Sequence, residues 1–325
     1  RRRDGAVEGA HVQENLSGKT HEVRARCTVA AVGPWALQVA GCNPGPLRFS
    51  KGVHLVLPPL PGPSDRAVLL TARSDRRVFF LIPWYGATLV GTTDTDYHGD
   101  IDQARVEDSD RDYLLSEVHH RCPGLGWTPA DVRGAYVGVR TLQGSSGHIG
   151  AATREWTLAE PHAGLLVPVG GKLTSARVEA AHTVDRCLAL LGQRLRPSVT
   201  GQRRLPWAPA DPWLDWSAGQ TAIGTGLGLD PSTAATCVRR HGTHVERLWT
   251  RLRNHPHDTH RIDPRYPFCR GEMAHALTHE MALTPQDVLR RRLPLTILGV
   301  AAGALVPQVE ALITAVPGNP THRSR

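Results

Sequence analysis

Two arginines in this sequence have the chemistry and the setting to bind a phosphate group. Arg140 closes the run Gly138, Val139, Arg140, and Arg154 follows Thr153 after a loop rich in glycine and serine. Two guanidinium groups at the rim of a sheet suit bidentate capture of a phosphate. Exposed arginines are also common on ordinary protein surfaces, so the residues alone leave both interpretations open.

His54 is a candidate general base. It lies inside the apolar run 53–57, where an imidazole either takes a proton from a substrate or packs as a hydrogen-bonded core residue. A second short motif, from Gly91 through Thr92 and Thr93 to Asp94, ends a strand in hydroxyl residues and an acid. This pattern is typical of a capped turn and also of a ligand contact.

A glycine turn follows the apolar run 165–169. Gly170 and Gly171 allow a ligand to approach the backbone, and Lys172, Leu173 and Thr174 lead into a helical pattern that reaches Gly192. A strand, a glycine turn and a helix N-terminus in this order predict an anion or cofactor contact. No GxGxxG follows a strand and no P-loop is present, so the other half of such a site is expected elsewhere.

The spacing of cysteine and histidine predicts no metal site. The six cysteines form no CxxC pair, which favours reduced thiols in a cytoplasmic protein. His275 and His279 are four residues apart, but their order with Glu280 does not match HExxH and no third ligand is indicated. We therefore expect these histidines, and likewise His241 and His244, on solvated faces.

The periodicity of apolar residues predicts an α+β fold. Short β-rich runs at 53–57, 67–70, 78–82 and 88–90 indicate an antiparallel sheet, and further strands are expected at 23–33, 135–140 and 165–169. Helices are expected at 110–121 and from 174 to 192. After a linker rich in proline and tryptophan, four more are expected at 232–240, 243–252, 272–283 and 285–292.

Charge and hydropathy narrow the function classes. The 325 residues carry a net charge of +8, which suits a phosphorylated substrate, an anionic membrane surface or nucleic acid. No helix-turn-helix, zinc-finger or RNP pattern is present, so we expect no nucleic-acid partner. No apolar run is long enough to span a bilayer. The chain opens with Arg1 rather than Met and with no apolar leader, which suggests an internal cut.

Taken together, these segments resemble FAD-dependent glycerol-3-phosphate dehydrogenases of the aerobic bacterial type, within the D-amino-acid-oxidase-like flavoprotein superfamily. The resemblance runs along nearly the whole chain and rests on the order and spacing of its motifs. These motifs are residues 31–35 (AVGPW), 51–54 (KGVH), 82–84 (IPW), 91–94 (GTTD), 138–140 (GVR), 153–154 (TR), 170–174 (GGKLT) and 279–292 (HEMALTPQDVLRRR).

The resemblance implies oxidation of sn-glycerol 3-phosphate to dihydroxyacetone phosphate, with FAD as hydride acceptor and membrane quinone as the next electron acceptor. Arg140 and Arg154 would hold the phosphate, His54 would be the base, and Lys172 would lie beside the flavin. Cofactor contacts would come from the glycines and the segment after the second turn, namely Gly33, Gly170, Gly171, Lys172, Leu173 and Thr174.

The resemblance also implies a division of the chain. Residues 1–44 and 141–194 would belong to the FAD-binding domain, 45–140 to an antiparallel substrate-binding domain, and 195–325 to a linker and a helical domain. The pyrophosphate-binding strand, turn and helix of the family would precede residue 1, so we expect a C-terminal portion of the enzyme. A cytoplasmic location, peripheral contact with the inner face of the membrane, and a homo-oligomer complete the expectations.

Two alternatives stay open. A glycerol-phosphate oxidase or another oxidase of the superfamily would share the substrate side and pass electrons to oxygen. A truncated, non-catalytic remnant would keep the fold pattern without turnover. One departure from the family pattern lies within the substrate motif, where Thr141 stands in place of the usual proline after the arginine.

Overall fold

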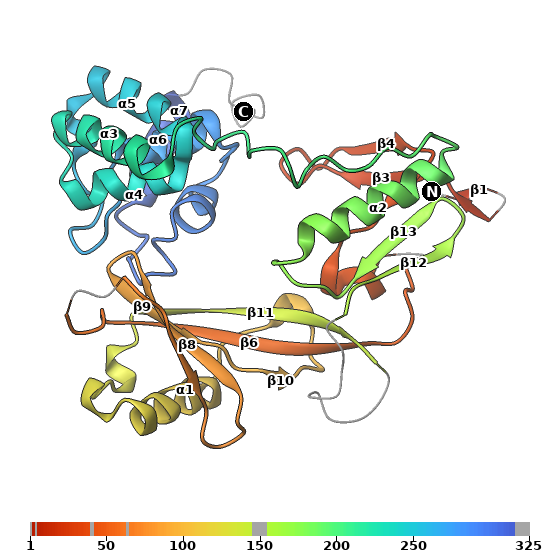
Figure 1. Ribbon diagram of the computed structural model, residues 1–325, viewed down its shortest axis with the longest axis horizontal. Coiled ribbons are helices and arrows are strands. Elements are labelled where there is room, and N and C mark those ends of the chain that lie inside the picture. Colours follow the sequence, from red (N-terminus) through yellow and green to blue (C-terminus); the bar gives the residue numbers. More distant parts are fainter. Residues whose placement is uncertain (1, 4, 40–41, 63–64, 145–154, 316–325) are drawn as a thin grey trace. The chain divides into compact units, whose positions relative to one another are not determined.

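The computed structural model describes residues 2–3, 5–39, 42–62, 65–144 and 155–315, and it has the expected α+β architecture (Figure 1). The chain forms two compact units. The first comprises residues 1–53, 93–107 and 137–203, and the second comprises 54–92, 108–136 and 204–325. Because the strands β6 (Leu47–Leu57) and β11 (Gly134–Gln143) each run through a boundary, the chain passes between the units within regular structure.

The first unit is built on short strands. They are β1 (Arg2–Arg3), β2 (Ala6–Val7), β3 (Gly9–Gln13), β4 (Thr20–Arg24), β5 (Thr28–Val29), β10 (Thr95–Asp96), β12 (Thr157–His162) and β13 (Leu165–Val169). Strands β3 and β4 form an antiparallel hairpin. Strand β13 pairs antiparallel with β12 and parallel with β5, where Leu166 lies opposite Val29.

The prediction of a single strand over 23–33 is wrong. Strand β4 ends at Arg24, and the chain then leaves its hairpin partner and begins β5 at Thr28, beside β13. Alternation of apolar and polar residues continues through this change of partner, so the sequence pattern does not reveal it. The helix expected from Thr174 is α2 (Ala176–Leu190), which begins two residues later with Ser175 at the N-cap.

The second unit contains the expected antiparallel sheet. The end of β6 pairs with β9 (Ala87–Gly91), which pairs with β8 (Val78–Trp84), which pairs with β7 (Val68–Thr71). The helix α1 (Asp108–Arg121) is joined to the β7–β8 turn by Glu117, whose carboxylate accepts the amide hydrogens of Arg73 and Ser74.

The C-terminal helices pack on this sheet and on one another. They are α3 (Trp213–Gly226), α4 (Pro231–His241), α5 (Val245–Asn254), α6 (Gly271–His279), a π-helical segment (Asp287–Arg292) and α7 (Val306–Ala315). One core joins Val56 and Leu89 of the sheet to Phe268, Met273 and Leu289. The second core lies among α3, α4 and α5, where Gly224 leaves no room for a β-carbon against Trp249.

The C-terminal signature has a local structural role. The carboxylate of Asp287 accepts the amide hydrogens of Leu283 and Thr284 at 3.0 and 2.9 Å, and the Thr284 hydroxyl accepts the amide hydrogen of Asp287. This reciprocal capping fixes the start of the helical segment. The helix expected over 272–283 ends earlier, at His279, because the backbone of Met281 turns to a positive φ of 57°.

Candidate active site

Arg140 is held by three oxygen atoms within the first unit. Its Nη1 donates to the Ser50 hydroxyl at 3.4 Å, to the Thr93 carbonyl at 3.3 Å and to the Asp94 carboxylate at 3.4 Å. Ser50 in turn donates to Asp94. The Arg140 side chain is 29% exposed, so its planar fork is both oriented and accessible. This arrangement can bind a phosphate or a carboxylate.

Gly52 allows the guanidinium group to reach this position. A β-carbon at residue 52 would lie only 2.5 Å from the Arg140 guanidinium carbon. The neighbouring backbone is fixed by Thr93, whose hydroxyl accepts the Val53 amide hydrogen at 2.9 Å. The Gly91–Asp94 motif therefore acts as part of the arginine's support, through its Thr93 carbonyl and its Asp94 carboxylate.

Arg154, the second expected phosphate ligand, lies outside the described residues. Thr141, at the position of the family's proline, has a buried hydroxyl that makes no hydrogen bond within the described part of the chain. Lys51, next to Gly52 in the sequence, is buried and pairs with Glu107 at 2.8 Å. The hydrogen bond from Lys51 lowers the pKa of the Glu107 carboxyl.

His54 lies in the second unit, opposite Gly91 in the β6–β9 register. Its ring stacks on Tyr136 with the centroids 4.8 Å apart and the planes 7° from parallel. Burial raises the pKa of Tyr136, so its phenol stays neutral at physiological pH. The histidine itself is only partly buried. The stack fixes the ring while leaving it partly accessible, which is the setting that a general base requires.

The two glycine turns of the sequence meet at one groove in the first unit. Strands β5 and β13 run parallel, and each is followed by a turn in which glycine has positive φ, 53° at Gly33 and 74° at Gly170. The groove has a volume of about 470 Å³. Its lining is mostly small or apolar and comprises Val29, Ala31, Gly33, Trp156, Pro168, Gly170, Ala176, Glu179, Ala180, Thr183, Val184 and Cys187.

This groove fits part of a flat cofactor. Ligands of α/β folds bind outside the carboxyl ends of parallel strands, which is where Gly33 and Gly170 lie. A β-carbon at Gly171 would clash with the carboxylate of Glu179. This carboxylate also accepts a hydrogen bond from Ser175 and the amide hydrogen of Lys172, the latter at 3.4 Å. Glu179 thus fixes the turn. Lys172, Leu173 and Thr174 are all exposed.

Three of the residues that support the candidate site carry no signal in the sequence, and two histidines that were expected to be solvated are buried. Ser50, Tyr136 and Glu179 act through partners that are distant in sequence or across a turn, and no motif marks them. Contrary to the expectation of solvated faces, His241 and His275 are buried, at 8% and 3% exposure. They face each other across α4 and α6, with their ring centroids 4.7 Å apart.

Family models match both parts of the chain. Residues 1–177 match the family described as FAD dependent oxidoreductase, and residues 198–320 match the C-terminal domain of alpha-glycerophosphate oxidase. Glycerol-3-phosphate dehydrogenase 2 of Mycobacterium tuberculosis is 31% identical over 296 residues, which are 90% of this chain and 50% of that protein. The glycerol-3-phosphate dehydrogenase of Mycobacterium leprae is 32% identical over 314 residues, 94% of this chain and 53% of that protein.

A solved structure has the same fold. The glycerol-3-phosphate dehydrogenase from Bacillus halodurans, complexed with FAD, superposes with a TM-score of 0.78 at 26% identity, covering 99% of this chain and 65% of that one. The chain spans about half the length of the curated relatives it matches. Within the described residues, no helix is long and apolar enough to cross a membrane.

Proposed function

This chain belongs to the FAD dependent oxidoreductase family, and from that premise we propose that it carries the substrate-binding part of an enzyme that oxidises sn-glycerol 3-phosphate to dihydroxyacetone phosphate. The observation that carries the proposal is the arginine arrangement, in which Ser50, Thr93 and Asp94 orient the exposed fork of Arg140. The relatives' names give the substrate class, and a guanidinium group held in a fixed orientation suits a phosphate monoester.

Each proposed residue has a distinct role. Arg140, together with Arg154, binds the phosphate and orients the C2 carbon. His54 accepts the proton of the C2 hydroxyl while the C2 hydrogen leaves as hydride, so that the alcohol loses two electrons and two hydrogens. FAD, when bound, supplies the hydride acceptor. The contact surface for FAD would be formed by Gly33, Gly170, Gly171, Leu173 and Thr174. Lys172 would favour negative charge on the flavin ring when it is reduced.

The wider setting of the enzyme is also a proposal. We assign residues 1–44 and 141–194 to the FAD-binding domain, 45–140 to the substrate-binding domain and 195–325 to the linker and helical domain. Quinone at the inner face of the cytoplasmic membrane would accept the electrons, with the net charge of +8 favouring an anionic surface. Assembly of the enzyme into a homo-oligomer also stays a prediction.

The deciding experiment compares substrates in the FAD-loaded protein that contains this chain. Arg140→Ala and Arg154→Ala should each raise the KM for sn-glycerol 3-phosphate by a factor of about 30, which corresponds to about 2 kcal/mol for a lost charged contact. Oxidation of unphosphorylated glycerol should be no slower than before. An unchanged KM for glycerol 3-phosphate in both variants would remove the phosphate-site assignment. Failure of the wild-type protein to reduce its flavin would favour the non-catalytic remnant.

One observation favours a second function. The match of residues 198–320 is to the C-terminal domain of an alpha-glycerophosphate oxidase, an enzyme class that passes electrons to oxygen. The substrate half of both enzymes would be the same. Stoichiometric peroxide during turnover in air would identify the oxidase, whereas slow reoxidation in air and fast reoxidation by a soluble quinone would identify the dehydrogenase.

A further inference from the structure

Two buried histidines and a carboxylate converge between α4 and α6, and none of the three is assigned a part in oxidation. His241 is the last residue of α4, and Gly242 follows it with a positive φ of 52° that ends the helix. His275 lies within α6, and Glu280 directly follows the end of that helix. Arg292 fixes the backbone at Glu280 by donating to its carbonyl at 2.8 Å. Packing of the two helices therefore brings the three side chains together.

The three potential ligand atoms have nearly the spacing of a metal site. Oε1 of Glu280 lies 3.4 Å from Nδ1 of His241 and 3.9 Å from Nε2 of His275. All three atoms lie within 4.8 Å of one another. Metal–ligand bonds of about 2.0–2.1 Å in tetrahedral geometry place ligand atoms about 3.3 Å apart. A small closing movement of the side chains is enough to reach that geometry.

The far side of His241 has the support that metal-bound histidines usually have. Nε2 of His241 lies 3.0 Å from Oε1 of Glu272, and an ionised carboxylate only accepts hydrogen bonds, so Nε2 carries the proton. Nδ1 of the neutral ring then presents a lone pair towards Glu280. With Nε2 of His275 in its unprotonated tautomer, three lone-pair-bearing atoms converge, and this is an arrangement that a bound cation satisfies. A carboxylate behind a ligand histidine is the common outer-shell arrangement of zinc sites.

We propose that His241, His275 and Glu280 bind a divalent first-row transition metal ion, with Zn²⁺ as the expected occupant. Two imidazoles and one carboxylate match the borderline ligand preference of Zn²⁺ and do not match the all-oxygen preference of Mg²⁺ or Ca²⁺. Both histidines are buried, whereas the Glu280 side chain is 31% exposed, so the ion reaches the site from that side. Water completes its coordination there.

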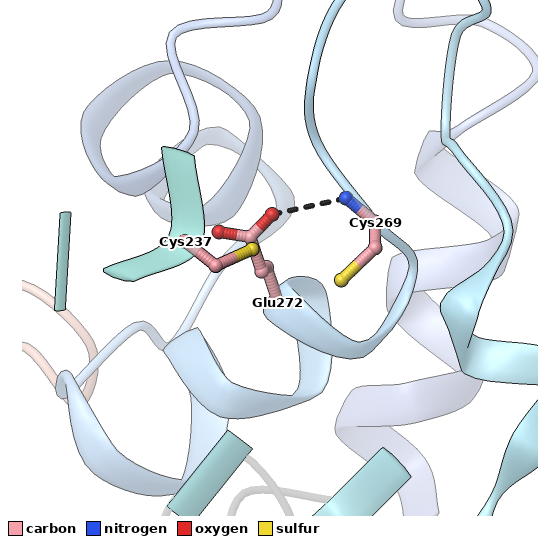
Figure 2. A group of neighbouring side chains, drawn as sticks. All are labelled: Cys237, Cys269 and Glu272. Atoms are coloured by element: carbon pink, nitrogen blue, oxygen red, sulfur yellow. Dashed lines mark hydrogen bonds between the residues drawn. The ribbon is translucent and has the colours of Figure 1, made fainter. Parts of the chain in front are cut away.

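A neighbouring group of potential ligands fits a metal less well. Figure 2 shows Cys237, Cys269 and Glu272, with Glu272 accepting the Cys269 amide hydrogen at 2.9 Å. The other oxygen of Glu272 accepts from Arg240 and His241, so both carboxylate oxygens are already engaged. The Arg240 guanidinium also lies 3.9 Å from the Cys237 sulfur and repels a cation there. Glu272 is therefore assigned to the support of His241.

Metal binding at this site would join two helices of the second unit. An ion that binds only the folded arrangement stabilises it in proportion to the logarithm of the ion concentration over Kd. The site lies among residues to which the oxidation reaction assigns no role. Its loss would accordingly change metal affinity and thermal stability.

The test titrates the full 325-residue chain with Co²⁺, whose visible absorption reports tetrahedral or five-coordinate binding, and then displaces Co²⁺ with Zn²⁺. We expect one Co²⁺ per chain, with Mg²⁺ and Ca²⁺ unable to compete. His275→Asn and Glu280→Gln should each weaken Co²⁺ binding at least tenfold, and Zn²⁺ should raise the Tm of the unaltered chain more than that of either variant. The control is His257→Asn, which changes an exposed histidine of the same unit and should bind as the unaltered chain does.

Three results would overturn the proposal of a metal site. They are the absence of a Co²⁺ spectrum at saturating metal, equal affinity in Glu280→Gln and the unaltered chain, and equal weakening in His257→Asn. The last would indicate binding by surface histidines, of which a chain with 17 histidines has several. If His275→Asn does not fold, Glu280→Gln decides alone, because its partly exposed side chain can change without leaving a buried cavity.

Discussion

The guanidinium group of Arg140 occupies the space that any side chain at Gly52 would need. The two residues lie on β11 and β6, and an added β-carbon would lie 2.5 Å from the guanidinium carbon. The close approach brings Nη1 within reach of Ser50, the Thr93 carbonyl and Asp94. The glycine therefore determines where the cationic group is held.

Gly52→Ala should separate substrate binding from stability. The clash involves the far end of a flexible side chain, so the arginine can move aside at small cost to folding, but it then leaves its three oxygen partners. We expect the KM for sn-glycerol 3-phosphate to rise about tenfold or more in the FAD-loaded protein, corresponding to about 1.4 kcal/mol, with Tm nearly unchanged. Steady-state kinetics and a thermal melt on the same preparation measure both.

Gly138→Ala is the matched control for this substitution. Gly138 lies on β11 two residues before the arginine, and a β-carbon there has no atom within 4 Å. Its KM should equal that of the unaltered protein. A Gly52→Ala protein that keeps normal KM would mean that the position of Arg140 is unimportant for substrate binding.

The antiparallel sheet of the second unit and most helices follow from local patterns, whereas the single strand expected over 23–33 does not occur. Strand β13 occupies the expected residues 165–169, and α4 and α5 agree with expectation to within two residues, because each has a strong apolar periodicity and a clear start or end signal. The helices α3 and α7 were not expected. Gly219, Gly224 and Gly226 weaken the helical pattern of α3, and its stability comes from close packing on α4 and Trp249.

The supports of the candidate site depend on long-range contacts. Arg140 was identified from its motif, but Ser50 lies 90 residues before it and carries no signal of its own. His241 and His275 were expected to be solvated because each helix was considered separately. Their burial results from the packing of α4 against α6 across 34 residues of sequence, and single-helix periodicity does not contain that information.

His54→Gln tests the proposed base. If His54 accepts the C2 hydroxyl proton, flavin reduction by glycerol 3-phosphate should slow by roughly two to four powers of ten, with flavin content preserved. The rate of the unaltered protein should rise with pH as the base loses its proton, and the variant should lose this pH dependence. Anaerobic stopped-flow reduction across pH measures it. Equal rates and equal pH profiles would leave His54 as a packing residue.

Tyr136→Leu provides the companion measurement. Replacing the stacked ring removes the contact that fixes the His54 imidazole but keeps the imidazole itself. A positioned base should lose part of its rate while keeping the pH dependence. Tyr136→Phe preserves the stack and should retain the rate, because burial keeps the Tyr136 phenol neutral in any case.

Glu179→Ala should weaken FAD binding through the glycine turn. The Glu179 carboxylate holds Ser175 and the Lys172 amide and lines the groove beside Gly170. Its removal should raise the Kd for FAD about tenfold or more, within the range for loss of hydrogen bonds to a charged group. Flavin fluorescence on dilution measures the release. Glu160→Gln removes the Arg186 ion pair elsewhere on α2 and should leave the Kd unchanged.

Asp230 should give the helical part of the chain a specific dependence on acid. Its carboxylate caps α4 by accepting the Thr233 amide hydrogen at 3.1 Å, and Arg261 donates to both of its oxygens. The hydrogen bonds from Arg261 and then those from Thr233 and Ser232 hold the pKa of Asp230 well below its ordinary value, against the opposing effect of burial.

The contribution of Asp230 to stability is therefore present above about pH 4, the ordinary pKa of aspartate, and is lost as the pH falls towards the lowered folded-state pKa. Asp230→Asn should cost on the order of 1 kcal/mol at pH 7, since the carboxylate is partly exposed and solvent weakens the ion pair. Urea unfolding of both proteins at several pH values between 7 and 3 should show this difference full at neutral pH and narrowing below pH 4. Asp215→Asn, in the exposed first turn of α3, is the control and should show a smaller difference at neutral pH. A difference for Asp230→Asn that stays constant down to pH 3, or that grows, would contradict a depressed pKa at the cap of α4.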